Sequence, residues 1–242
     1  MTQTQDSSSD RPLANFDAIC RRAASVGLAV RGGFHPAPGE FARQLPLVTA
    51  ATLVLLGFTG SAQWEDFHRS AEAQDGLPHP LDRWSRRVVG TLALEFAAAA
   101  IYPHGEHLEL PFQQLALRAE PLHQSPIGLL IHPQWGLWHA YRGALVLSHR
   151  IELPDMVPSV HPCHVCAAKP CLSGCPVGAF RPGFYDVRAC TKHVLSAAGS
   201  ACRDDGCLAR RACPVGSESR YHEDQMRFHM RAFIDAITTE VR

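Results

Sequence analysis

The sequence predicts an α/β layered domain that is followed by a small cysteine-rich module. Up to about residue 155, segments with strand patterns alternate with segments with helix patterns, which is typical of layered α/β domains. Beyond that point cysteine becomes frequent, and eight of the nine cysteines lie between Cys163 and Cys213, a region with little core of its own. We therefore expect a tail over residues 1–12, an α/β domain over 13–155, a cysteine module over 156–218 and a C-terminal helix over 219–242.

Composition excludes several classes of function. The 242 residues are 46% hydrophobic, which is ample for a buried core, and 23 basic side chains balance 23 acidic ones. With no net charge, the protein has no general attraction for nucleic acid or for a membrane surface. The longest apolar run, Leu45 to Phe58, contains Pro46 and is too short to span a bilayer, and Met1 to Arg11 lacks a signal-peptide pattern. We expect a cytoplasmic protein of undetermined oligomeric state that binds neither nucleic acid nor membrane.

The first half of the chain contains the expected α/β elements. The tail is polar and predicted to be disordered, and Leu13 to Val26 predicts a helix with Cys20 as a small hydrophobic residue on its apolar face. A short strand over Gly27 to Val30 should end at Gly32-Gly33. Val48 to Phe58 is a continuous apolar run, which is typical of a strand buried on both faces.

Helical patterns follow this strand. Trp64 to Ala73 predicts a short helix, and Leu81 to Tyr102 predicts a longer one that Pro103 stops. Pro111 to Ala119 predicts another helix with proline in its first turn. The C-terminal segment Ser219 to Arg242 is amphipathic, and its apolar stripe should cover either the protein's own core or a partner subunit.

A β-hairpin is predicted between the last of these helices and the cysteine module. Pro126 to Ile131 and Leu137 to Leu147 have strand patterns, and His132 to Gly136 forms the turn between them. The hairpin is unusually rich in rings and basic groups. Composition alone favours an ordinary hairpin with aromatic residues facing the core, and a binding surface is the alternative. The residues concerned are His132, Trp135, Trp138, His139, Tyr141 and Arg142.

The cysteines form two groups with the same ending. The first group is C-x2-C-x4-C-x3-C-P and the second is C-x11-C-x4-C-x5-C-P, and both end in Cys-Pro-Val-Gly. In two-cluster ferredoxins the cysteine before proline ligates the cluster of the other group. Eight thiolates make two complete four-cysteine shells and leave Cys20 over. The candidate metal ligands are Cys163, Cys166, Cys171, Cys175, Cys190, Cys202, Cys207 and Cys213.

Two alternatives compete with iron–sulfur clusters. Disulfides require an oxidising compartment, to which this sequence shows no route. Two all-cysteine zinc sites are the stronger alternative, because C-x2-C is also a zinc spacing. Zinc sites, however, usually pair one C-x2-C with another and do not require Cys-Pro. The doubled Cys-Pro ending therefore favours iron–sulfur clusters.

The cysteine region resembles epoxyqueuosine reductase and its reductive dehalogenase relatives. The matching residues are Cys175-Pro-Val-Gly-Ala and Tyr185-Asp-Val-Arg-x-Cys190. The resemblance implies a cobalamin-dependent redox protein with two [4Fe-4S] clusters in a ferredoxin-like module. It also implies the ligand sets, which cross between the groups: Cys163, Cys166, Cys171 and Cys213 would bind one cluster, and Cys175, Cys190, Cys202 and Cys207 the other.

The hairpin resembles a different family, the CblC-type cobalamin-processing proteins. The similar residues run from Ser125 through Ile131-His-Pro-Gln-Trp-Gly-Leu-Trp138 to Arg142-Gly, and continue in Ile151-Glu-Leu-Pro-Asp. This resemblance implies a nitroreductase-like fold for the α/β domain and a corrin beside the hairpin. The implied cobalamin contacts are His132, Trp135, Gly136, Trp138 and Arg142, with His132 as a candidate axial ligand.

One departure affects the expected reaction. Epoxyqueuosine reductases place a catalytic aspartate before the hairpin, where this chain has His104-Gly-Glu-His-Leu-Glu with no aspartate; Glu106, His107 or Glu109 would have to replace it. We therefore expect an oxidoreductase that takes electrons from a donor protein and passes them through the clusters to a cobalamin or related corrinoid. The alternatives are a ferredoxin-type carrier without corrin, an epoxyqueuosine-reductase-like enzyme on an organic substrate, and a nitroreductase-like flavoprotein with attached clusters.

Overall fold

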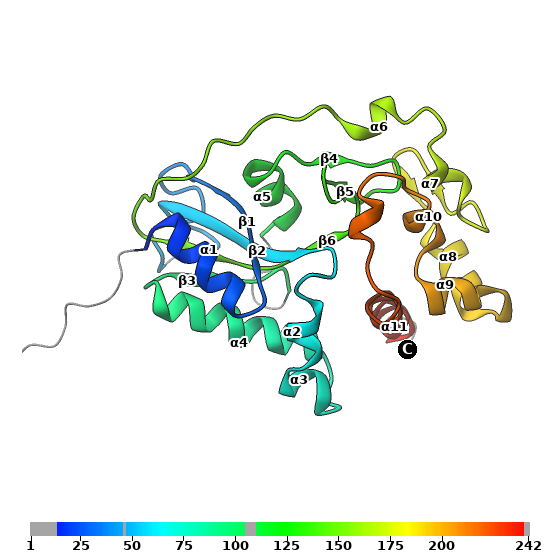
Figure 1. Cartoon of the computed structure of the whole chain (residues 1–242), viewed down its shortest axis with the longest axis horizontal. Coiled ribbons are helices and arrows are strands. Elements are labelled where there is room, and N and C mark those ends of the chain that lie inside the picture. The colour runs from blue at the N-terminus through cyan, green and yellow to red at the C-terminus, as the bar shows by residue number, and fades with distance from the viewer. Residues whose placement is uncertain (1–13, 46, 105–109, 240–242) are drawn as a thin grey trace, which may run out of the picture. The chain divides into compact units, whose positions relative to one another are not determined.

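The structure is a computed structural model that describes residues 14–45, 47–104 and 110–239 (Figure 1). The predicted tail over 1–12 lies outside the described residues, as do Glu106, His107 and Glu109. The chain forms two compact units. The first unit consists of three segments: the chain up to Phe58, Glu65–Glu120 and Tyr141–Met156. The second unit consists of Thr59–Trp64, Pro121–Ala140 and Val157–Arg242.

A four-stranded sheet forms the centre of the first unit. Its strand order is β1-β2-β6-β3, with bounds Ala29–Phe34, Thr52–Thr59, His139–Leu147 and Ala99–Ile101. β1 is antiparallel to β2, with Ala29 opposite Gly57, and β3 is antiparallel to β6, with Ala99 opposite Val146. Residues 52–58 of β2 are all buried, which confirms the strand predicted to be covered on both faces.

Three helices pack against this sheet. They are α1 (Phe16–Ser25), α4 (Pro80–Glu95) and α5 (Phe112–Ala119). α1 and α5 pack on β1, and α4 packs on β3. α1 and α4 lie near each other in Figure 1, and the Arg22 guanidinium joins them by binding the Glu95 carboxylate at 3.0 Å. These elements confirm the mixed α/β class.

Several predicted elements have different limits. The helix predicted over 81–102 ends at Glu95, because Ala97 adopts a left-handed backbone (φ 49°) and the next residues form β3. The helix predicted over 64–73 is two short helices, α2 (Trp64–His68) and α3 (Ala71–Gln74). β1 does not end at Gly32-Gly33 but continues through both glycines, with a bulge between Val30 and Gly33.

The predicted hairpin over 126–147 is wrong. Its first strand, β5 (Leu130–Ile131), pairs with β4 (His123–Gln124), whereas β6 belongs to the four-stranded sheet. Only the tight turn is as predicted, because His132 and Gly136 form an isolated antiparallel bridge. The cause is that β5 has only two residues, and β4 from the preceding segment already pairs with their backbone groups.

The second unit contains short helices and one long helix. The short ones are α6 (Pro162–Val165), α7 (Pro170–Ser173), α8 (Val187–Leu195), α9 (Ser200–Asp205) and α10 (Leu208–Arg211). A small hairpin of β7 (Phe180–Arg181) and β8 (Phe184–Tyr185) precedes α8. The long helix α11 (Glu223–Thr239) confirms the predicted C-terminal helix and packs on α9 and α8. In the described parts of the chain, no helix has the length and apolarity needed to cross a membrane.

Candidate metal centres

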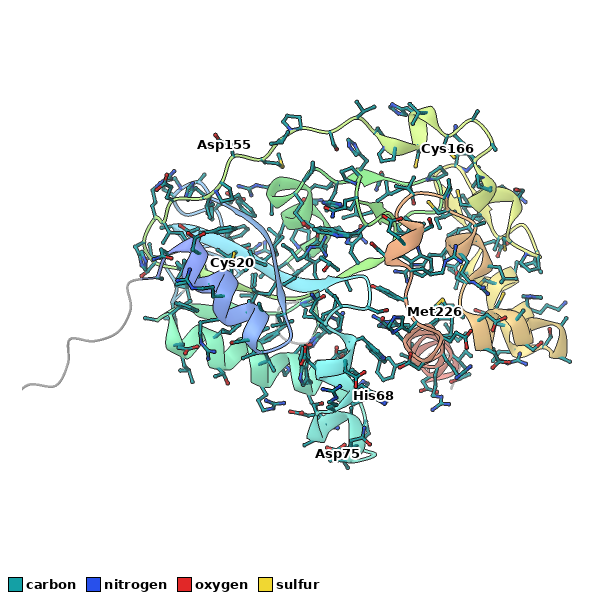
Figure 2. The ribbon with its side chains drawn as sticks, viewed as in Figure 1. Cys20, His68, Asp75, Asp155, Cys166 and Met226 are labelled. Carbon is teal, nitrogen blue, oxygen red and sulfur yellow. The ribbon has the colours of Figure 1, made fainter. Side chains whose placement is uncertain are left out.

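The eight cysteines of the module lie in or beside its short helices. Cys163 and Cys166 lie in and after α6, and Cys171 lies in α7. Cys190 and Cys202 lie in α8 and α9, and Cys207 immediately precedes α10. Figure 2 shows Cys166 between α6 and α7, whereas Cys20 lies on α1 in the first unit. None of the nine cysteines forms a disulfide bond.

The first set of thiols gathers around an apolar cluster. Cys171 and Cys213 are buried in this cluster with Ile127, Ile131 and Leu137, and Cys163 packs against it. Burial raises the pKa of the Cys213 thiol, and the neighbouring Cys171 and Cys166 raise it further. Burial likewise raises the pKa of Cys163, followed by the effects of Cys213, Cys171 and Cys166. Cys213 therefore lies with the first group, although it ends the second in sequence.

The second set lines one cavity of about 440 Å³, whose wall includes Cys175, Cys190, Cys202 and Cys207. Burial raises the pKa of the Cys202 thiol, and Cys190 and Cys175 raise it further. Cys175 therefore lies with the second group, although it ends the first in sequence. The first set thus includes Cys163, Cys171 and Cys213 with Cys166 as a neighbour, and the second lines the cavity; that each set binds a cluster stays a prediction.

Backbone amides also point at these sulfurs. The Ala179 N–H donates to the Cys175 sulfur at 3.3 Å. Burial is the largest effect on the Cys207 thiol and raises its pKa, whereas the amides of Arg210 and Ala209 lower it. Amides directed at sulfur stabilise the thiolate, the form that binds metal. Among the described residues, no three His, Cys, Asp or Glu side chains form a group that could hold a single metal ion.

The wall of the cavity that the second cysteine set lines also contains residues that the sequence did not assign to a site. Arg210 donates to the Leu137 carbonyl oxygen, and its guanidinium lies 4.5 Å from the Trp138 ring and 4.6 Å from the Tyr221 ring. α11 contributes Met226, Met230 and Phe233 to the same wall, and Figure 2 shows Met226 on this helix. The sequence showed that α11 has an apolar stripe, but it did not show that this stripe faces the cavity of the second cysteine set.

The predicted corrin contacts in the second unit are engaged in local packing. The His132 ring stacks on Trp135 at 4.0 Å, and its Nδ1 accepts the Gln134 N–H at 3.0 Å. The Trp138 ring is 1% exposed and is covered by Arg210 and Tyr221, so it presents little flat surface to a ligand. Gly136 lies against the backbone of Val215, two residues after Cys213.

The fifth predicted contact, Arg142, belongs to the first unit. Its Nε donates to the Tyr141 carbonyl oxygen at 2.8 Å, and its Nη1 lies 3.8 Å from the Asp82 carboxylate. His104, the described start of the stretch that lacks the aspartate, also approaches Asp82 at 3.4 Å, and burial lowers the pKa of its imidazole. Corrin contact by these five residues stays a prediction.

Comparison with known structures identifies the fold. A structure of selenomethionine-labelled epoxyqueuosine reductase matches with a TM-score of 0.51 at 17% identity, over 87% of this chain and 68% of that one. Epoxyqueuosine reductase from Streptococcus thermophilus matches with a TM-score of 0.50 at 15% identity, over 84% of this chain and 66% of that one.

This chain has the epoxyqueuosine reductase fold. It spans about two thirds of the length of those enzymes. No protein-family model matches the sequence. No curated protein matches it either. The comparisons therefore support the fold and the mixed α/β class, while the nitroreductase-like and ferredoxin-like descriptions of its parts stay predictions.

Proposed function

We propose that the protein is an iron–sulfur oxidoreductase that holds two [4Fe-4S] clusters and passes electrons from them to a bound cobalamin. The arrangement of the cysteines carries the proposal. Two sets of four thiols lie in one unit, and the cysteine before each proline lies with the other group's set. Four thiolates are the donor set of a [4Fe-4S] cluster, and this exchange is a feature of two-cluster ferredoxins.

The residues around the sulfurs suit such clusters. The first set lies against Ile127, Ile131 and Leu137, and α11 places Met226 and Phe233 on the cavity wall of the second. Apolar walls exclude water, and amide donors such as Ala179 N–H stabilise charge on sulfur. When bound, the clusters supply one-electron transfer at potentials that burial and such hydrogen bonds set.

The cobalamin part of the proposal has separate support. It rests on the fold shared with epoxyqueuosine reductase and on the resemblance of residues 125–142 to cobalamin-processing proteins. The residues named for the corrin in the second unit do not form an open surface there, because Trp138 is covered and His132 bonds its own turn. We therefore assign no corrin ligand and no step at cobalt to a named side chain.

Iron content in paired alanine variants tests the cluster assignment. The purified protein should contain about eight iron atoms per chain, and Cys20→Ala should leave that number unchanged. Cys163→Ala with Cys213→Ala removes two ligands from one set, so about half of the iron should remain. Cys207→Ala with Cys213→Ala removes one ligand from each set, so nearly all of the iron should be lost.

The two double variants separate the competing assignments. If each group bound its own cluster without exchange, Cys207 and Cys213 would share one set, and the iron contents of the two double variants would be reversed. A zinc content of about two atoms per chain, with no visible absorption, would overturn the iron–sulfur proposal altogether.

Corrin binding is tested on the iron-loaded protein. Hydroxocobalamin should co-elute with it under anaerobic conditions, and dithionite should shift the corrin spectrum toward a base-off or Co(I) form. If the clusters are intact but no corrin is retained, the cobalamin part of the proposal fails and the protein is a ferredoxin-type carrier. A flavin spectrum in place of a corrin spectrum would favour the alternative of a flavoprotein with attached clusters.

A further inference from the structure

One face of the cysteine unit exposes apolar and basic side chains together. The β7–β8 hairpin exposes 55% of Phe184 and 36% of Tyr185, and Val187 at the start of α8 is also exposed. Arg181 in the same hairpin and Arg188 in α8 are exposed as well. We call this the hairpin face, and it consists of Lys169, Arg181, Phe184, Tyr185, Val187, Arg188 and Lys192.

These residues come from the β7–β8 hairpin, from the following helix α8 and from Lys169 at the start of α7. The hairpin tip and Lys169 line one hollow of about 550 Å³, and Tyr185 lines both this hollow and the cavity of the second cysteine set. The Phe180 and Tyr185 rings stack at 4.7 Å, which fixes the hairpin, and the Asp186 N–H donates to the Ala179 carbonyl oxygen at 2.8 Å. The face is therefore an ordered surface directly outside the second set.

Helix α8 joins this surface to the cavity. Arg188, Lys192 and Leu195 are four and three residues apart, so they lie on one exposed side of the helix. Cys190 and Val194 lie four residues apart on the other side, where Val194 is buried and Cys190 lines the cavity. A protein bound to the exposed side would be separated from a cluster ligand by the thickness of one helix.

The charge of this face is one-sided. The face has four basic side chains, and between Arg181 and Lys192 the chain has one acidic residue; the exposed Asp204 and Asp205 follow in α9. The one acidic residue, Asp186, is used locally, because its side chain accepts the Ala189 N–H at 2.9 Å and caps α8. Within the described residues, Lys169, Arg181, Arg188 and Lys192 form no ion pair with a carboxylate.

We propose that the hairpin face is the docking surface for an acidic electron-carrier protein that reduces the second cluster. The proposal rests on the proposed function, because it requires a cluster held by Cys175, Cys190, Cys202 and Cys207. Exposed basic groups around apolar side chains attract an acidic partner and then exclude water at the centre of the contact. In each encounter one electron leaves the reduced carrier and one oxidised cluster gains it, with no bond formed or broken. Such redox encounters use small, transient interfaces.

Stopped-flow reduction of the iron-loaded protein by photoreduced flavodoxin, an acidic carrier, tests the surface. The bimolecular rate constant should fall steeply between about 10 mM and about 0.3 M salt, because screening shortens the range of the attraction. Arg188→Glu should lower the rate at low salt by about tenfold and flatten the salt dependence. Arg21→Glu, at an exposed position of helix α1 in the first unit, makes the same change in net charge and should leave the rate near that of the unaltered protein.

Two controls separate this proposal from the proposed function. Iron content should be the same in Arg188→Glu and in the unaltered protein, and so should reduction by methyl viologen radical, a small cation, at about 0.3 M salt, where its attraction to the altered charge is screened. If the clusters are present but Arg188→Glu and Arg21→Glu react with flavodoxin alike, the docking surface is overturned while the clusters stand. If no iron is bound in the unaltered protein, the proposed function itself fails.

Discussion

Gly136 and Val215 touch through their backbones, and no side chain fits between them. A Cβ on Gly136 would lie 1.8 Å from the Val215 carbonyl oxygen, and a Cβ on Gly216 would lie 2.3 Å from the Trp135 carbonyl carbon. The turn over 132–136 thus rests directly on the second Cys-Pro-Val-Gly loop. This contact gives the turn a role beside Cys213 that its aromatic sequence did not indicate.

Gly136→Ala should disturb the first cysteine set. The clash pushes the turn and the loop that carries Cys213 apart. Iron content should therefore fall toward half, and the visible absorption of the clusters should be lost at a lower temperature. Gly128→Ala is the matched control, because Gly128 also has positive φ (80°) but no atom lies within 4 Å of its added Cβ. Backbone strain alone costs about 1 kcal/mol, and equal behaviour of the two variants would show that the contact is unimportant.

Glu120→Gln should destabilise the first unit. The Arg31 side chain is fully buried and its Nη2 lies 2.9 Å from the Glu120 carboxylate, which also accepts the Tyr141 hydroxyl. Removing the carboxylate charge leaves a buried guanidinium uncompensated, which costs about 3 kcal/mol. Urea unfolding followed by circular dichroism measures the change in the free energy of unfolding.

The control for this variant is Glu95→Gln. Glu95 pairs with Arg22 at 3.0 Å, but both side chains are more than a third exposed, so the loss should stay below about 1 kcal/mol. Equal losses in the two variants would mean that burial adds nothing to the Arg31–Glu120 pair.

Arg210→Ala should weaken the second unit. Arg210 donates to the Leu137 carbonyl oxygen and lies over the Trp138 and Tyr221 rings, so the variant loses hydrogen bonds and two cation–π contacts worth about 2 kcal/mol together. The visible absorption of the clusters should disappear at a temperature several degrees lower. Arg211→Ala removes only a 3.7 Å pair with the half-exposed Asp205 and should change this temperature little. A larger effect from Arg211 would contradict the prediction.

Removal of iron should unfold the cysteine region and spare the sheet. The helices α6, α7, α9 and α10 have only four to six residues each and would lose the groups that join them. After oxidation, chelation and removal of the chelator, brief chymotrypsin treatment should cut within residues 157–220 and leave the β1-β2-β6-β3 sheet protected. An unchanged digestion pattern would show that this region is held by its own core.

Local patterns predicted much of the fold. The apolar run of β2, the amphipathic α11 and proline before α5 each specify an element through nearby residues, and the structure has these elements. The pattern failed where partners are distant in sequence. Ala99 to Ile101 continues a helical composition, but pairing with β6 makes it a strand, and Ala97 turns the chain to allow it. Alanine has strong helix propensity, and this tertiary pairing overrides it.

The candidate site was predictable to a different extent. Cysteine spacing and Cys-Pro singled out eight thiols that all lie in the second unit, and their roles as cluster ligands stay a prediction from the resemblance. The aromatic turn was less informative, because a ring at a turn has the same sequence whether it faces a ligand or packs on a neighbouring loop. Trp138 packs under Arg210, which is 72 residues later, and no local pattern indicates such a contact.

The exchange of Cys175 and Cys213 has a consequence for biosynthesis. A chain emerging from the ribosome presents Cys163, Cys166 and Cys171 together, but the fourth thiol of that set is synthesised 42 residues after the third. The second set is complete at Cys207, before the first can close at Cys213. Under the proposed assignment, the set whose first cysteine is translated earlier receives its last cysteine later. Until Cys213 is translated, a scaffold protein that delivers clusters would meet only three thiols of that set.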